Sequence, residues 1–274
     1  MLTVVGNSLN SGNKKVLDKM AKIDLEYIRK ETLQQKAGGA QYIKLDATSL
    51  QENELDYLRQ AIPVVEEQDA RVMVCSNSLG TLLEVIPLAR REIIVGPVEF
   101  KREKIDPLLS RMATARVPVK LVASTVNADR PEDDICPEAA LLTAQEFLDY
   151  LLDQGVRRSD ILLDPVVRSL ENNPRNGKVF LNTLELFKLD FPQVGTIANL
   201  SALSEGLPRR ENISPFFLAL AMAKGLDFAV MNVQETGMAK ALVVTTAIIG
   251  KDRNLESYTD FCRQDRTARS AGRA

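Results

Sequence analysis

DILL (160–163), VGTIANL (194–200) and DFAVM (227–231) are the three runs of sequence that decide the fold. Each is short and apolar with β-branched residues, which favours a strand. Between them, apolar residues recur at helical spacing over about 177–190 and about 213–224. A strand, a helix and a second strand in this order are typical of a βαβ unit, whose strands are parallel. The stretch therefore predicts two such units in series.

The same alternation continues back to the N-terminus. Five further runs predict strands at Leu2–Val5, Gln41–Leu45, Arg71–Val74, Glu92–Val95 and Val117–Ala123, in addition to Asp160–Leu163, Val194–Leu200 and Asp227–Met231. Further helix patterns lie at about 14–37, 53–67, 78–90, 101–115, 138–154 and 236–249. Eight strand–helix pairs in 274 residues predict an α/β fold, a single (β/α)8 TIM barrel over 1–262. Residues 263–274 carry four arginines and almost no apolar side chains, which predicts a flexible basic C-terminal tail.

The composition favours a globular protein that binds neither nucleic acid nor a membrane. Hydrophobic residues make up 45% of the chain and charged residues 26%, and the formal net charge is only -2. No window reaches the roughly 18 apolar residues that a membrane span needs, and the N-terminus has no signal-peptide pattern. We therefore expect a cytoplasmic protein.

The chain contains no histidine, which narrows its possible chemistry. Ser-His-Asp catalysis is excluded, and zinc loses its commonest protein ligand. The three cysteines, Cys75, Cys136 and Cys262, lie far apart in the sequence, which argues against a disulfide framework and a thiolate cluster. We expect no bound metal, zinc included, and a small molecule or a protein as the partner.

In a TIM barrel the active site forms where the strands end and the following loops begin. Small amides, hydroxyls and carboxylates stand at almost every predicted strand end. The candidate site residues at these ends and in the loops after them are Asn10, Asp46, Cys75, Asn77, Asp164, Asn199, Ser201, Ala202, Arg210 and Asn232. A mostly neutral polar ring favours a heterocycle with several hydrogen-bonding edges over a phosphate, which prefers glycine-rich loops and cations.

The second half of the chain carries a family resemblance in DILLDPVV (160–167), FPQVGTIANLSALSEGLPRR (191–210) and PFFLALAMAKGLDFAV (215–230). These segments resemble the pterin-binding methyltransferases of the methyltetrahydrofolate:corrinoid type, which share a TIM barrel with dihydropteroate synthase. Weaker agreement extends to both ends, at Gly6, Asn10, Asp46 and the GKD run at 250–252. The resemblance implies tetrahydrofolate or methyltetrahydrofolate as substrate, a corrinoid (cobalamin) carried by a partner protein, and a homodimer.

Asp164 stands where the resemblance implies a carboxylate that binds the amino-pyrimidinone edge of the pterin. An ionised carboxylate offers two acceptors to two adjacent N–H donors in one plane, which suits this role. The alternative is a structural or helix-capping aspartate. The Asp164-Pro165 pair at the C-terminal end of a predicted strand favours the binding role.

Three positions depart from the family pattern. The resemblance implies an aspartate after the third strand and asparagines after the fourth and the seventh, but this chain has Cys75, Gly96 and Ala202. In the family the last of these amides assists protonation of pterin N5. Its loss predicts a barrier to methyl transfer from methyltetrahydrofolate that is higher by about 2–4 kcal/mol. Asn199 is a candidate replacement for the amide; the alternative is a pocket rebuilt for another donor or acceptor.

Three other candidates each have two possible roles. Cys75 is either a reactive thiol or, as free cysteines more often are, a small buried apolar residue. Arg210 matches the family's arginine after the seventh strand, and it either holds an anionic substrate tail or braces its loop. Ser201 either contacts the substrate or satisfies the loop backbone.

We expect an enzyme that moves a methyl or related one-carbon group between a tetrahydrofolate-type molecule and the cobalt of a partner corrinoid protein. Cobalt would be the nucleophile, so the protein needs to supply only orientation and leaving-group activation, which agrees with the absence of histidine. Two alternatives stay open: a methyltransferase with a non-folate donor, such as a methylated or halogenated one-carbon compound, and a non-catalytic subunit that binds a corrinoid protein. A dihydropteroate synthase is disfavoured because the sequence lacks a basic diphosphate-binding loop.

Overall fold

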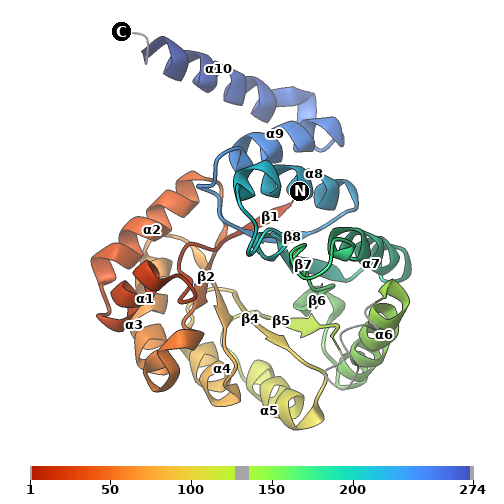
Figure 1. Cartoon of the computed structure of the whole chain (residues 1–274). Coiled ribbons are helices and arrows are strands. Elements are labelled where there is room, and N and C mark those ends of the chain that lie inside the picture. Colours follow the sequence, from red (N-terminus) through yellow and green to blue (C-terminus); the bar gives the residue numbers. More distant parts are fainter. Residues whose placement is uncertain (1, 127–135, 272–274) are drawn as a thin grey trace.

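Eight parallel strands pair in sequence order and close into one barrel (Figure 1). The computed structural model describes residues 2–126 and 136–271. The strands are β1 (Thr3–Gly6), β2 (Tyr42–Asp46), β3 (Arg71–Cys75), β4 (Ile93–Val98), β5 (Val119–Ser124), β6 (Ile161–Asp164), β7 (Gly195–Asn199) and β8 (Phe228–Met231). β8 pairs with β1, and this pairing closes the sheet. The predicted (β/α)8 TIM barrel is confirmed, and every predicted strand overlaps an observed one.

Helices cover the outside of the barrel. They are α1 (Lys14–Ala21), α2 (Leu25–Ala37), α3 (Glu54–Glu67), α4 (Leu79–Val85), α5 (Arg102–Ala113), α6 (Pro137–Asp153), α7 (Asn176–Asp190), α8 (Ser214–Ala223), α9 (Met238–Ile248) and α10 (Glu256–Ala271). The prediction of one helix over about 14–37 is wrong, because Ile23 adopts φ 48 and Asp24 starts a second helix by accepting from the Tyr27 N–H at 3.0 Å. No helix in the described part of the chain is long and apolar enough to cross a membrane.

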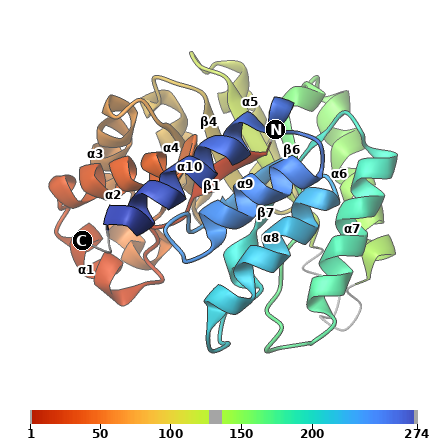
Figure 2. The ribbon, with the colours of Figure 1, turned by 90° about the horizontal axis from the view of Figure 1, so that it is seen from above.

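The chain also forms a further helix, α10, where the pattern predicted none; it follows α9 after a break at 249–252 and the short 3-10 turn Arg253–Leu255. Helix α10 packs on α9 and projects beyond the barrel in Figure 1, whereas in Figure 2 it lies across the front of the molecule. Asp252 caps its start by accepting from the backbone N–H groups of Tyr258 at 2.9 Å and Ser257 at 3.1 Å. The flexibility of 263–274 stays a prediction, and residues 272–274 lie outside the described part.

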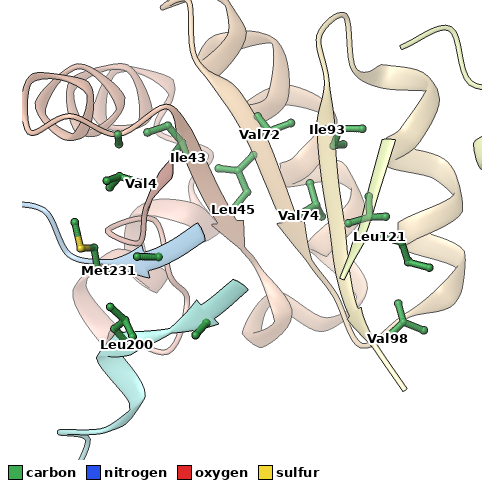
Figure 3. Close-up of a cluster of buried hydrophobic side chains, with 14 of the residues drawn as sticks. Val4, Ile43, Leu45, Val72, Val74, Ile93, Val98, Leu121, Leu200 and Met231 are labelled. Atoms are coloured by element: carbon green, nitrogen blue, oxygen red, sulfur yellow. The ribbon is translucent and has the colours of Figure 1, made fainter. Parts of the chain in front are cut away.

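Alternate residues of each strand face opposite sides of the sheet and build two cores. Outward-facing side chains such as Val4, Ile43, Val72 and Leu121 pack against the helices (Figure 3). The inward-facing side chains that fill the barrel are Val5, Tyr42, Met73, Cys75, Ile94, Val122, Leu162, Ile197 and Val230. This packed apolar layer fills the inside of the barrel. A ligand site can therefore form only at the inward-facing positions near the C-terminal strand ends.

Candidate functional site

A cavity of about 340 Å³ opens at the C-terminal ends of the strands. Its lining residues are Lys44, Asp46, Thr48, Met73, Cys75, Ser76, Asn77, Pro97, Val122, Asp164, Val166, Val167, Ile197, Ala198, Asn199, Ala202 and Val230. Met73, Val122, Ile197 and Val230 belong to the inner barrel core and form an apolar floor. The volume falls within the ~300–1,000 Å³ usual for small-molecule sites and suits a compact heterocycle.

Six of the predicted site residues meet in this cavity: Asp46, Cys75, Asn77, Asp164, Asn199 and Ala202. The other four, Asn10, Ser201, Arg210 and Asn232, are not among its lining residues. Asn10 Oδ1 accepts from the Gly12 N–H at 2.8 Å, and Asn232 Oδ1 accepts from the Gln234 N–H at 3.0 Å. Both side chains therefore stabilise turns.

Arg210 has the contacts of a residue that braces its loop. Its Nε donates to Ser204 Oγ at 3.0 Å, and its Nη2 donates to the carbonyl oxygen of Ser201. Ser204 is fully buried, so these bonds tie the exposed Arg210 to the interior of the loop. Substrate contact by Arg210 or Ser201 stays a prediction.

Asp164, the last residue of β6, lies in the cavity wall. Its Oδ1 accepts from the Val166 N–H at 2.9 Å, which helps to hold Val166 at a φ of 52°. Burial raises the pKa of Asp164 to about 6, although the Val166 N–H and the charge of Lys44 both favour the ionised form. At neutral pH the group is therefore a carboxylate with acceptor capacity left for a ligand.

Lys44 is the cavity residue that the sequence analysis missed. It is 6% exposed, and its Nζ lies 2.9 Å from Asp46 Oδ2. Burial by itself lowers the pKa of Lys44, but the neighbouring Cys75, Asp46 and Asp164 more than reverse this, so the ammonium form is retained. The available signal was a lysine within the strand YIKLD, two residues from each of the inward-facing Tyr42 and Asp46.

Cys75 is buried, and burial raises the pKa of its thiol to about 11 despite the nearby Lys44 ammonium. A protonated and mostly buried thiol is a poor nucleophile, so the structure favours the apolar role. We expect iodoacetamide at about pH 8 to label the exposed Cys136 and Cys262 in the folded protein, and Cys75 only in denaturant. Peptide mass spectrometry measures each site, and rapid labelling of native Cys75 would instead support a reactive thiol.

Asn199, the last residue of β7, brings an amide to the cavity. Its Oδ1 is buried and has no hydrogen-bond partner within the described residues. A buried acceptor without a partner costs free energy, which a bound ligand with an N–H group can offset. Ala202, in the turn Leu200–Ala202 that follows, offers only a methyl group to the same cavity.

Gly96 stands at a position where the backbone leaves no room for a side chain. Its φ is +116°, and a Cβ atom placed there would lie 2.9 Å from the Val122 carbonyl oxygen. No side chain fits at this position, so β4 contributes Pro97 to the lining and no amide at position 96. Across the described residues, no three His, Cys, Asp or Glu side chains gather where a metal ion could bind.

The chain resembles known proteins in sequence and in fold. No protein-family model matches the chain. Over 265 residues the chain is 27% identical to methylcorrinoid:tetrahydrofolate methyltransferase from Eubacterium limosum, covering 96% of this chain and 97% of that protein. The barrel matches 7,8-dihydropteroate synthase from Vibrio fischeri ES114 with a TM-score of 0.67 at 15% identity, covering 90% of this chain and 93% of that one. Dihydropteroate synthase from Coxiella burnetii in complex with pteroic acid matches with a TM-score of 0.66 at 17% identity, covering 91% and 93%. These solved structures share its fold.

Proposed function

We propose that this chain, which belongs to the pterin-binding family of dihydropteroate-synthase-like barrels, is a methyltransferase that passes a methyl group between the cobalt of a partner corrinoid protein and tetrahydrofolate. The observation that carries the proposal is Asp164, a carboxylate at the end of β6 in a cavity of heterocycle size. The Eubacterium limosum relative, which matches nearly end to end, supports the reaction type.

The cavity favours tetrahydrofolate as methyl acceptor. Removing a methyl group from N5 requires that nitrogen to become cationic, and Ala202 offers no donor to assist. Methylating N5 has a different need: the N5 lone pair attacks the methyl carbon, the cobalt–carbon bond breaks with both electrons left on cobalt, and the N5 proton leaves to solvent. Asn199 Oδ1, a buried acceptor with no partner within the described residues, is suited to accept the N5–H and orient that lone pair.

The test mixes the purified chain with a methylated corrinoid protein and tetrahydrofolate without oxygen. We expect the absorbance of methylcobalt to give way to that of cobalt(I), with an equal amount of methyltetrahydrofolate by mass spectrometry. A spectral change that needs a methylated or halogenated compound instead of folate would support the non-folate alternative. Binding of the corrinoid protein without any spectral change would support a non-catalytic subunit.

Ala202→Asn is expected to speed methyl transfer from methyltetrahydrofolate to cobalt(I) by about tenfold or more, because it returns an amide to the cavity wall near N5. Stopped-flow absorbance of cobalt(I) measures the rate. Ala202→Val, which adds volume without a donor, is the matched control. An unchanged rate in a variant that still binds folate would mean that N5 lies elsewhere in the cavity.

We also propose that the chain forms a homodimer through α8 and α9, which pack side by side. Phe216 and Leu220 on α8 and Ile248 on α9 are 73%, 54% and 77% exposed. A helix with apolar residues on several faces usually packs against other elements on more than one of those faces. Light scattering is expected to give twice the chain mass of 30.3 kDa. Leu220→Lys together with Ile248→Lys is expected to give monomers, whereas a monomeric wild type would contradict the proposal.

A further inference from the structure

The cavity contains a buried positive charge, Lys44, that takes no part in the proposed methyl transfer. Among the described residues that line it, Lys44 alone is cationic. Its side chain comes from β2, and Asp164 comes from β6, four strands away around the closed barrel. The substrate cavity is therefore lined by an ammonium group from one side and by a carboxylate from the other.

The ion pair with Asp46 does not by itself explain why a lysine is buried at position 44. A buried charge costs several kcal/mol unless it is well paired, and the apolar Met73 and Ile94 fill comparable inward positions on the next two strands. Asp46 has a second partner, since its Oδ1 accepts from Thr48 Oγ1 at 2.9 Å. An ammonium carries three N–H donors, and the structure gives Lys44 Nζ one acceptor, Asp46 Oδ2 at 2.9 Å. Donors remain for a ligand.

The proposed substrate has the complementary pattern. An amino-pyrimidinone ring places two N–H donors on one edge and a carbonyl oxygen beside them, so a carboxylate and a cation together match the ring. Burial has the largest influence on both groups, but Asp164 also raises the pKa of Lys44 and Lys44 also lowers that of Asp164, as expected for two charges that share one small cavity. Both side chains line the same cavity of about 340 Å³, so a single ring can contact both.

We propose that Lys44 is a specificity-determining residue, which donates a hydrogen bond to the ring carbonyl oxygen of a 4-oxopterin while Asp164 accepts from the adjacent N–H groups. This inference rests on the proposed function. A 4-amino ring presents N–H donors where the 4-oxo ring has an acceptor, so it faces the Lys44 ammonium donor to donor. Its N3 also carries no hydrogen, so it offers Asp164 one donor fewer. Such a mismatch in a buried polar site is strongly disfavoured.

The test is calorimetric titration with tetrahydrofolate and with its 4-amino analogue. We expect the wild type to prefer the 4-oxo ring by at least roughly 30-fold, and Lys44→Met to lower this preference by about tenfold because 4-oxo affinity is lost, while the part that the N3–H contributes at Asp164 remains. Lys120→Met is the matched control. Lys120 is a half-buried lysine on β5 whose Nζ lies 3.7 Å from Glu92 Oε2, and it does not line the cavity. Its loss is expected to leave the preference unchanged.

A second variant, Lys44→Gln, keeps the test possible if Lys44→Met does not fold. Lys44→Gln carries an amide that can turn either its N–H or its oxygen to the ring, so it is also expected to lower the preference for the 4-oxo ring. If a folded Lys44 variant keeps the wild-type preference, or loses affinity for both rings alike, Lys44 is structural and this inference is overturned. Failure of the wild type to bind tetrahydrofolate would overturn the proposed function as well.

Discussion

Replacing Asp164 by asparagine is expected to weaken tetrahydrofolate binding by about 30- to 1,000-fold. Asparagine nearly preserves volume and keeps an oxygen for the Val166 N–H, which Asp164 Oδ1 binds at 2.9 Å. The other oxygen becomes an NH2 group that faces an N–H donor of the ring. Both of these donors are then left unpaired. Calorimetric titration at about pH 7.5 measures the loss.

Asp160→Asn is the matched control, because Asp160 precedes the opposite end of β6 and pairs with Arg157 away from the cavity. Its affinity for tetrahydrofolate is expected to equal that of the wild type. Since the pKa of Asp164 is raised to about 6, wild-type affinity should fall as the pH drops below that value, and Asp164→Asn should lose this dependence. Wild-type affinity in Asp164→Asn would remove the main support for a pterin site.

The same substitution is expected to stabilise the unliganded protein at neutral pH. Burial raises the pKa of Asp164 from 3.8 to about 6, so the folded state binds more protons than the unfolded state between these values. The contribution of Asp164 to stability is therefore greatest at low pH and falls as the pH rises through about 6. Asparagine does not ionise, so it carries no buried charge at neutral pH. It should therefore raise the free energy of unfolding by about 2 kcal/mol above pH 7, with little gain below pH 4.

Denaturant unfolding at both pH values separates a binding role from a structural one. If Asp164 stabilised the barrel, its replacement would lower the free energy of unfolding at both pH values. A gain at neutral pH together with a loss of folate affinity would show that Asp164 is retained for binding at a cost in stability.

Gly96→Ala is expected to lower the free energy of unfolding by about 3 kcal/mol. The residue has a φ of +116°, which side chains rarely adopt, and the new Cβ would lie 2.9 Å from the Val122 carbonyl oxygen and 3.2 Å from Val122 Cβ. Backbone of β4 and β5 would have to separate to relieve the contact. Chemical denaturation measures the change.

Gly80→Ala is the control for Gly96→Ala. Gly80 lies in α4 without positive φ, and an added Cβ would meet only Ser78 Oγ at 3.6 Å. This control should be neutral or slightly stabilising, because alanine favours a helix over glycine. Wild-type stability in Gly96→Ala would mean that β4 can relax, and that an amide at position 96 is then sterically possible.

The fold was predictable because strands and helices bury side chains at different periods. Val72 and Val74 on one face and Met73 on the other already mark β3 as a strand buried on both sides. The break between α1 and α2 was not predictable from this period, since it depends on the backbone of Ile23 and the cap at Asp24. Helix α10 was missed because its highly charged sequence has little apolar stripe to detect.

The candidate site was predictable only in part. Asp164 and Asn199 end their strands, and a TIM barrel brings strand ends together whatever the details of its packing. Asn10 and Asn232 follow strands too, but their oxygens bind the backbone of their own turns. Such local hydrogen bonds compete with ligand contact, and composition alone does not say which of the two wins.

The sequence by itself determined the order of strands and helices and the set of polar groups at the strand ends, because periodicity and turn residues act over a few neighbouring positions. Only the tertiary structure decided that Lys44 and Asp164, far apart in the chain, share one cavity, and that Gly96 has no room for a side chain. The reason is physical: the energy of a buried charge and the space at a Cβ atom depend on atoms from other strands, and closure of the barrel alone sets those distances.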